Sequence, residues 1–297
     1  MLLALDADCR LSYQALAEKL GLTTTAIKKR MDRLVETGVI EEFSVLFKPA
    51  MVNSDYLVAL ICTDGSEDEE ELMEFMDASL NVVQVGQVVT GVGRLYFRHC
   101  EYSGAEGLQG ISTFLRALDC VTHTELHTIL TQRGEQFEIK NLHLRVLKPL
   151  LKDARMQAGE IAAETGLTAR RASRAIKEMQ DSDAFWFAVR WNLGLGNNSE
   201  FYLKITCKEQ RFKKDDMDEW LRTSFPHEFW FSFSSAMEPI LFAKFVAEHF
   251  RDTEKISSKA KSAPFSESVD VLLSYPVKKY PRLGRIKIDE LIRDAGI

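Results

Sequence analysis

The sequence repeats itself at a constant spacing of 145 residues, and this repeat constrains the fold more than any other feature. The tripeptide Gly21-Leu22-Thr23 recurs as Gly166-Leu167-Thr168. The same offset, without any gap, aligns matching residues along most of the chain: Arg10 with Arg155, Met31 with Ile176, Tyr56 with Phe201, Cys62 with Cys207 and Phe97 with Phe242. Chance similarity seldom keeps one register over two structural units, so the chain is predicted to be a tandem duplication. The polar segment 131–140 is the predicted linker.

Residues 12–40 have the pattern of two helices joined by a tight turn and followed by a strand. Ser12 is a predicted N-cap, and Gly21 ends the first helix because a residue without a side chain enters the left-handed conformation easily. Thr23 or Thr24 then caps a second helix, whose buried stripe has a spacing of four and three residues: Ile27, Met31 and Leu34. Its opposite face is basic, which is typical of a DNA-reading helix-turn-helix. A merely solvated helix face would show the same charges.

The candidate DNA contacts lie on this helix and on its repeat. Cations there would neutralise phosphates and reach guanine edges, and hydroxyls at a helix N-terminus can hold a phosphate. The candidates are Thr23, Thr24, Thr25, Lys28, Lys29 and Arg33 in the first copy, and Arg170, Arg171, Ser173, Arg174 and Lys177 in the second. Arg30 lies beside the buried stripe, so it is either a structural ion pair or a DNA contact. Since Glu178 replaces Arg33 and Ala175 replaces Arg30, we predict that the N-terminal copy is the better reader.

The charge distribution is compatible with this interpretation although the net charge is −6. Acidic residues are concentrated in 64–77, which holds eight acidic side chains and no basic one, and this run is predicted to be a solvated helix face. No apolar run approaches the roughly 20 residues that span a bilayer, and the N-terminus lacks the features of an export signal. The five cysteines are scattered, which predicts reduced thiols and a cytoplasmic protein.

The segment after each helix-turn-helix is predicted to be a ferredoxin-like βαββαβ unit. In the first copy the expected strands are 55–63, 82–89, 95–99 and 121–130, the helices are 67–80 and 107–118, and the turn is Gly91-Val92-Gly93. The fold class is therefore α+β, with two winged helix-turn-helix domains alternating with two ferredoxin-like domains. The expected domains are 1–50 and 141–195 (winged helices), 51–132 and 196–277 (ferredoxin-like), and 278–297 (a basic tail and helix).

Two stretches carry a family resemblance. RLSYQALAEKLGLTTTAIKKRMDRLVETGVIEEFSV resembles the winged helix of Lrp/AsnC transcription regulators, and VVTGVGRLYF resembles their turn between the middle strands. The resemblance implies a transcription regulator that binds double-stranded DNA, and a chain that holds both halves of a pseudo-dimer. The sheets of the two copies can pair with each other or with a second chain. A small-molecule effector is also implied, near Thr90, Gly91, Gly93 and Arg94, although Arg94 stands where the family usually has an acidic residue.

Several features of the sequence allow a second interpretation. Siroheme decarboxylases resemble this family and pair two such units, so a tetrapyrrole enzyme is the second interpretation. No catalytic motif is present, and neither an enzyme, a cofactor nor a resident metal is expected. His123, Glu125 and His127 share a strand face at a spacing that a metal could use, but solvation explains them as well. The aromatic residues of the second half are expected in the core, or else in a pocket for a planar ligand. The helix within 286–297 would pack where the missing turn of the short first helix would lie, in its own chain or a partner's, or else cap the second sheet.

Overall fold

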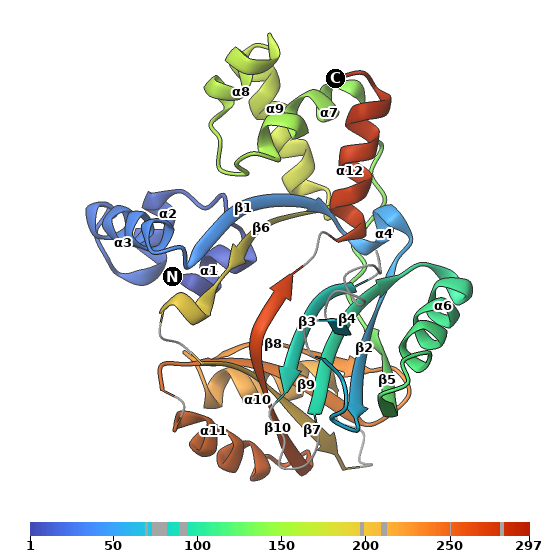
Figure 1. Cartoon of the computed structure of the whole chain (residues 1–297). Coiled ribbons are helices and arrows are strands. Elements are labelled where there is room, and N and C mark those ends of the chain that lie inside the picture. Colours follow the sequence, from blue (N-terminus) through green and yellow to red (C-terminus); the bar gives the residue numbers. More distant parts are fainter. Residues whose placement is uncertain are drawn as a thin grey trace. The chain divides into compact units, whose positions relative to one another are not determined.

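The computed structural model describes residues 1–68, 71–72, 82–88, 94–196, 199–208, 213–249, 251–279 and 282–297. The chain forms two compact units. The first, called here the head unit, comprises Met1–Asn53, Arg133–Gly196 and Leu283–Ile297. The second, the sheet unit, comprises Ser54–Gln132 and Asn197–Arg282. Both winged helices therefore share one unit and both ferredoxin-like copies share the other, and the predicted fold class is confirmed (Figure 1).

The first winged helix forms where the local signals predict it. It consists of α1 (Leu2–Ala7), α2 (Tyr13–Leu20), α3 (Thr24–Glu36) and β1 (Ile40–Phe47), followed by the short α4 (Pro49–Val52). The Ser12 hydroxyl accepts from the Ala15 N–H at 3.0 Å, and the Thr23 hydroxyl accepts from the Ala26 N–H at 3.2 Å. Gly21 ends α2 with a φ of 63°, a left-handed conformation that a side chain would strain. These caps confirm the predicted turn.

The second winged helix repeats this arrangement. It consists of α7 (Asn141–Leu150), α8 (Ala158–Thr165), α9 (Ala169–Asp181), β6 (Phe185–Trp191) and a 3₁₀ turn, η1 (Leu193–Gly196). The Thr168 hydroxyl caps α9 by accepting from the Arg171 N–H at 3.3 Å, and Gly166 ends α8 with a φ of 65°. Both caps are the repeat equivalents of Thr23 and Gly21. The two copies therefore use the same local interactions to build the same turn.

The two winged helices are joined by their strands. β1 pairs antiparallel with β6, from Ile40 opposite Trp191 to Phe47 opposite Phe185. Each first helix packs on the strand of the other copy, α1 on β6 and α7 on β1. The Trp191 indole N–H also donates to Asp6 across the copies at 2.8 Å. The head unit is thus a pseudo-dimer in which the first helix of each copy packs on the strand of the other copy.

The C-terminal helix α12 (Leu283–Asp294) packs against β1, α4 and α7. Gly284 lies so close to β1 that a Cβ atom would be 2.3 Å from the Phe47 carbonyl oxygen. Arg285 donates to Glu42 at 3.3 Å and to the Ser44 hydroxyl at 3.2 Å. Both expected positions of this helix are wrong, since it lies beside the long α7 and belongs to the head unit. The physical reason is that β1 and α7 offer one shared apolar surface, which buries Ile288 and Ile292.

The sheet unit is one closed sheet of eight strands. Its order is β10-β3-β4-β2-β5-β8-β9-β7, with β7 and β10 paired. The first copy supplies β2 (Asp55–Thr63), β3 (Val82–Val88), β4 (Arg94–Tyr102) and β5 (Val121–Leu130); the second supplies β7 (Ser199–Cys207), β8 (Phe229–Ser235), β9 (Ile240–Ala247) and β10 (Ser266–Lys279). Among the described residues, this unit also contains the helices α6 (Gly104–Arg116), α10 (Lys214–Ser224) and α11 (Asp252–Lys261). Most of the helix expected over 67–80, and the turn 91–93, lie outside the described residues.

Two seams join the copies within this sheet. At one seam β5 pairs with β8 through two residue pairs, Ile129 with Ser235 and Leu130 with Ser234. At the other seam β10 pairs with β3, from Ser274 opposite Val88 to Lys279 opposite Gln84. Each copy has the same internal strand order, so the two seams are equivalent by the repeat. The sheets of the two copies therefore pair with each other within the chain.

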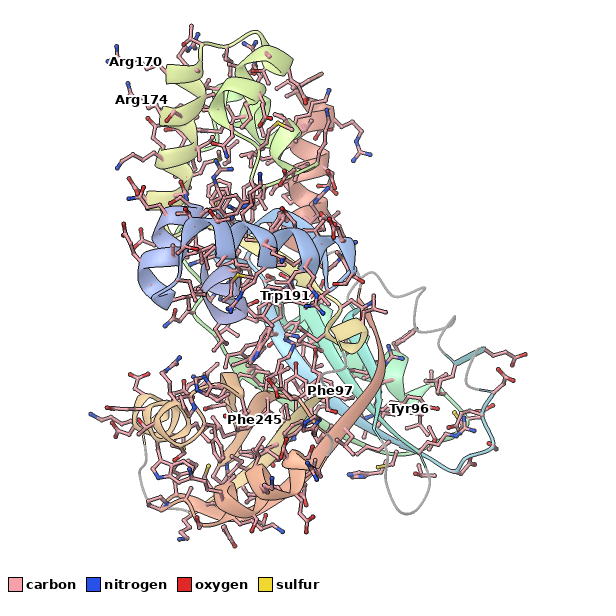
Figure 2. The ribbon with its side chains drawn as sticks, turned by 90° about the vertical axis from the view of Figure 1, so that its left-hand side faces the viewer. Tyr96, Phe97, Arg170, Arg174, Trp191 and Phe245 are labelled. Carbon is pink, nitrogen blue, oxygen red and sulfur yellow. The ribbon has the colours of Figure 1, made fainter. Side chains whose placement is uncertain are left out.

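Aromatic rings occupy the face of the sheet that the helices do not cover. Tyr96 packs toward the helices, whereas its neighbour Phe97 stacks on Tyr202 with ring centroids 4.8 Å apart (Figure 2). Phe233 stacks on both His99 and Phe242, at 5.9 and 5.4 Å. On the helix side of the second copy, Phe225, Phe229 and Phe245 form the core together with Trp220. Most of the aromatic residues singled out in the second half are buried, as expected, although Phe231 is exposed.

Candidate nucleic-acid interface

The outward face of α3 presents several exposed cations. Lys28, Lys29 and Arg33 are exposed, and none of them forms an ion pair with a described residue. Thr24 and Thr25 are exposed at the N-terminus of the same helix, and Thr23 is its cap. Arg30 is also exposed and has no ion-pair partner among the described residues, so the structural ion pair considered for it is not formed there. α3 thus presents several free cations beside a capped helix N-terminus.

The same face of α3 also carries two acidic side chains. Asp32 and Glu36 line a shallow groove of about 440 Å³ together with Thr25, Lys28, Lys29 and Arg33. The groove runs along the helix, so the acids lie at its C-terminal end and the threonine at its N-terminal end. Anionic phosphates are favoured at the N-terminal end, where the helix dipole and free N–H groups add to the lysines.

The equivalent face of α9 is basic but partly neutralised. Arg170, Arg171, Ser173, Arg174 and Lys177 are all exposed, and Arg170 and Arg174 project away from the helices behind them (Figure 2). Two of the cations, however, are paired along the helix. The Arg174 guanidinium donates to Glu178 at 2.8 Å, and the Lys177 ammonium lies 3.9 Å from the Asp181 carboxylate. Fewer cations of α9 than of α3 are therefore free to meet a phosphate.

Glu178 connects the reading helix to the body of the second winged helix. One of its oxygens accepts from Arg174, and the other lies 3.1 Å from Nε2 of the buried His143 on α7. The Lys140 backbone N–H donates to the His143 Nδ1 at 3.1 Å, so the imidazole proton is on Nε2 and is donated to Glu178. Hydrogen bonds from His143 and then Arg174 lower the pKa of Glu178. Glu178 occupies the repeat position of Arg33, so this position carries opposite charges in the two copies.

The loops in front of α2 and α8 are tied together by two arginines. Arg10 donates to the carbonyl oxygens of Ala154 and Met156, and Arg155 donates to those of Cys9 and Leu11. The Arg155 guanidinium also lies between two rings, 5.3 Å from the centre of Tyr13 and 5.4 Å from that of Phe43. Burial lowers the pKa of Arg10. The sequence alignment of Arg10 with Arg155 was the available signal for this pair, but its role was not predicted.

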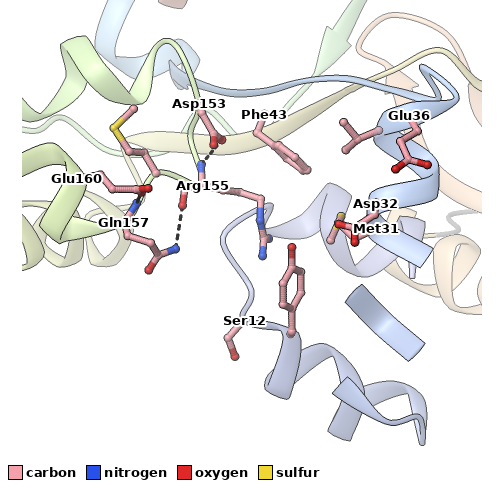
Figure 3. A pocket seen from close by; sticks show the side chains of 12 residues that line it. Ser12, Met31, Asp32, Glu36, Phe43, Asp153, Arg155, Gln157 and Glu160 are labelled. Atoms are coloured by element: carbon pink, nitrogen blue, oxygen red, sulfur yellow. Dashed lines mark hydrogen bonds between the residues drawn. The ribbon is translucent and has the colours of Figure 1, made fainter. Parts of the chain in front are cut away.

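A crevice of about 590 Å³ lies beside this pair, between the two winged helices. Figure 3 shows Asp32 and Glu36 on one side, Asp153 and Glu160 on the other, and Arg155 with Phe43 between them. Glu160 accepts from the Gln157 backbone N–H at 2.8 Å, and Asp153 accepts from that of Arg155 at 2.7 Å. Four carboxylates around one guanidinium make this crevice acidic, so it repels a DNA backbone. The exposed cations lie instead on the outer faces of α3 and α9.

The candidate effector residues are only partly described. Thr90, Gly91 and Gly93 lie outside the described residues. Arg94 is described, and its Nε lies 3.7 Å from the Glu67 carboxylate. Glu67 also accepts from the Thr63 hydroxyl at 2.8 Å and the Tyr96 hydroxyl at 3.0 Å, and its side chain is 3% exposed. Glu67 was expected on a solvated acidic face, which is wrong, because these donors hold its carboxylate inside. Arg94 therefore has a structural partner.

One cap was missed at the candidate interface. Thr168 is exposed at the start of α9 and is the repeat equivalent of Thr23, so it belongs with the candidate phosphate-binding hydroxyls. The recurring Gly-Leu-Thr tripeptide was sufficient to find it. The contact between Glu178 and His143, by contrast, joins residues 35 positions apart and has no such signal in the sequence.

Comparison with known proteins shows what the two winged helices of the head unit resemble. The family model described as winged helix-turn-helix DNA-binding matches residues 1–41 and 139–183. Each half of the chain therefore begins with a segment that matches this model. The two matched ranges coincide with the two winged helices of the head unit, which confirms the tandem duplication. No helix of the described part of the chain has the length and hydrophobicity needed to cross a membrane.

Curated relatives of these winged helix-turn-helix domains are transcription regulators. The uncharacterized HTH-type transcriptional regulator PH0140 of Pyrococcus horikoshii is 28% identical over 99 residues, 32% of this chain and 59% of that protein. The uncharacterized HTH-type transcriptional regulator PH0061 of the same organism is 27% identical over 140 residues, 46% of this chain and 90% of that protein. The chain thus spans about three fifths of the first relative's length. The resemblance to winged helix-turn-helix transcription regulators is confirmed at the level of these matches.

One solved structure matches nearly the whole chain in fold. The siroheme decarboxylase NirDL in complex with an iron-uroporphyrin III analogue has a TM-score of 0.55 at 11% sequence identity. It covers 95% of this chain, and this chain covers 92% of it. At that identity the likeness concerns the fold alone, and it supports the arrangement of two winged helix and ferredoxin-like units in one chain.

Proposed function

We propose that this protein is a sequence-specific DNA-binding transcription regulator that places α3 and α9 on one DNA duplex. The observation that carries the proposal is the pair of capped helices in one compact unit, each with exposed cations on its outer face. The relatives named as HTH-type transcriptional regulators support it. Such helices enter the major groove with their N-terminal residues at the base edges and their cations near phosphates.

The two helices contribute unequally in this proposal. Lys28, Lys29 and Arg33 of α3 form no ion pair with a described residue, whereas Arg174 and Lys177 of α9 are paired with Glu178 and Asp181. An exposed ion pair is weak, but the carboxylate still repels an approaching phosphate. We therefore expect the half-site under α3 to dominate affinity. A small-molecule effector and a cytoplasmic location complete the proposal, and the five free cysteines agree with that location.

The decisive experiment is DNA binding by fluorescence anisotropy, with a duplex from the promoter of the protein's own gene. Lys28→Ala/Lys29→Ala is expected to weaken binding at least tenfold and to reduce the slope of log K against log salt by about two, or about one for each lost phosphate contact. The matched control is Arg116→Ala/Lys213→Ala, which removes the same charge from exposed positions of the sheet unit and is expected to bind normally. Equal binding by both double variants would contradict the proposal.

A siroheme-decarboxylase-like enzyme is the second candidate, because the fold match extends over 95% of the chain and that relative was solved with a tetrapyrrole analogue. In this chain, however, Phe97, Tyr202, Phe233 and Phe242 stack on one another across the uncovered face of the sheet. A tetrapyrrole bound there would have to separate these rings. Titration with a soluble iron porphyrin carrying several carboxylates separates the two candidates: a saturable absorbance change at one porphyrin per chain supports the enzyme, and none supports the regulator.

A further inference from the structure

Three metal-ligating side chains converge beside the β5–β8 seam. Glu125 and His127 come from β5 of the first copy, and Glu238 comes from the turn between β8 and β9 of the second. One ligand atom from each lies within 4.8 Å of the other two. His127 is fully buried, whereas Glu238 is exposed, so one side of the cluster faces solvent. His123, which the sequence places on the same strand face, is exposed and is not a member of the cluster.

The orientation of His127 fits a metal ligand. Its Nδ1 lies 3.3 Å from the Ser235 hydroxyl, which leaves Nε2 directed at the carboxylates. Histidine ligands usually bond their second ring nitrogen to such a partner, which fixes the ring. The Ser235 hydroxyl oxygen also accepts from the backbone N–H groups of Met237 and Glu238, each at 3.3 Å. The same serine therefore orients the imidazole and holds the turn that carries Glu238.

In the absence of a metal, the Lys204 ammonium supplies a positive charge beside the carboxylate of Glu125. The Lys204 ammonium forms an ion pair with Glu125, and His127 Nε2 lies 2.7 Å from the same carboxylate oxygen. Hydrogen bonds from Lys204 and then His127 offset the burial of Glu125 and lower its pKa. A divalent cation would displace Lys204 from this oxygen. The imidazole proton would then be on Nδ1, beside the Ser235 hydroxyl, and Nε2 would offer its lone pair to the metal.

We propose that Glu125, His127 and Glu238 bind a divalent transition cation such as Zn²⁺. One imidazole nitrogen and two carboxylate oxygens, with a side open to solvent, are a donor set that such cations accept. The metal would tie the first copy to the second across a seam of only two residue pairs. Because binding requires the assembled seam, it stabilises the folded sheet unit. The site is independent of the DNA-binding proposal, and either can fail without the other.

The test uses the full chain after chelator treatment and dialysis. Zn²⁺ is titrated in competition with a chromophoric chelator, and Co²⁺ is titrated for its visible absorption. The wild-type chain is expected to bind one ion, with a rise in the thermal unfolding midpoint. Glu238→Gln removes an exposed ligand without disturbing the core, and it is expected to weaken binding at least tenfold and to abolish the rise. Lys204→Met is expected to tighten binding, because the competing ammonium is gone.

His123→Gln is the matched control, because it removes a histidine from the same strand outside the cluster and is expected to leave affinity unchanged. Absence of Zn²⁺ binding by the wild-type chain would overturn the site. So would equal affinities of the wild-type and Glu238→Gln chains, or a loss in His123→Gln as large as that in Glu238→Gln, because those results indicate ordinary surface binding.

Discussion

Arg10 and Arg155 occupy equivalent positions in the two copies, and each donates to the loop that carries the other. Arg10 Nη1 lies 3.3 Å from the Met156 carbonyl oxygen, and Arg155 Nη1 lies 3.0 Å from that of Leu11. A reciprocal pair of this kind is the signature of a two-fold interface, here contained within one chain. It fixes the two winged helices relative to each other through backbone groups, which are unaffected by side-chain divergence after the duplication.

Loss of either arginine should destabilise the head unit. Hydrogen bonds to a charged group contribute about 1.5–3 kcal/mol, so Arg10→Ala and Arg155→Ala are each expected to lower the free energy of unfolding by about that amount. Because both close the same interface, the double variant should lose less than the sum of the two. Urea unfolding followed by intrinsic tryptophan fluorescence, to which Trp186 and Trp191 of the head unit contribute, measures the effect. Arg116→Ala, an exposed residue of the sheet unit, is the control and should change little.

Removing the charge of Glu178 should strengthen DNA binding. Glu178→Gln releases the Arg174 guanidinium and removes a negative charge from the reading face of α9, while the amide oxygen can still accept from His143. We expect a several-fold gain in affinity and a steeper salt dependence. Anisotropy titrations at three salt concentrations would show this. Asp215→Asn, in the sheet unit, controls for net charge; an equal gain there would rule out a local effect.

Acidification should destabilise the sheet unit through His99. Its ring lies against Tyr56 and Phe233, and burial, with smaller effects from Arg282 and Lys244, lowers the pKa of His99 to about 3. The unfolded chain takes up this proton near pH 6.5, whereas the folded chain does not. Between pH 6.5 and 3 the free energy of unfolding therefore falls with falling pH, by about 1.4 kcal/mol per pH unit from this group.

His99→Phe keeps a ring in the stack and removes this titration. Urea unfolding at pH 7, 6, 5 and 4 should give a difference between the wild-type and His99→Phe chains that changes steadily below pH 6.5. A constant difference over that range would contradict the assignment to His99, because the carboxylates titrate in both proteins.

Alkylation of Cys9 should measure unfolding of the head unit, and alkylation of Cys100 should measure unfolding of the sheet unit. Burial raises the pKa of Cys9 and of Cys100 to about 12, and both thiols are fully buried. Since the thiolate is the reactive form, neither should be alkylated by iodoacetamide at pH 8 in the native protein. The partly exposed Cys62 should react first. In increasing urea, mass spectrometry should show that Cys9 is alkylated when the head unit unfolds and Cys100 when the sheet unit unfolds. Rapid alkylation of either thiol in the native protein would contradict its burial.

The sequence predicted those elements whose signals are local. The caps Ser12 and Thr23, the glycine end of α2 and the strand 55–63 depend on neighbours a few residues away, and all are confirmed. The repeat extended these predictions to the second copy without further information. The exposed lysines of α3 were also identifiable, because helical spacing determines which residues share a face.

Features that depend on distant partners could not be predicted in this way. α12 lies where β1 and α7 meet, a surface that exists only after the copies have assembled. Glu67 is one of eight acidic residues in 64–77, and only its hydrogen bonds from the Thr63 and Tyr96 hydroxyls distinguish it. Glu238 reaches the Glu125–His127 pair only because the turn after β8 lies at the seam. In each case an interaction between segments far apart in the sequence outweighs the local preference.

Closure of the eight-stranded sheet within one polypeptide makes the pairing of the two copies independent of protein concentration. Two separate subunits must meet before they can act, and they part again on dilution; here that encounter is intramolecular and its equilibrium does not vary with the amount of protein in the cell. Selection can then alter one half without a matching change in the other. The opposite charges of Arg33 and Glu178 are a difference that identical subunits, encoded by one gene, could never have acquired.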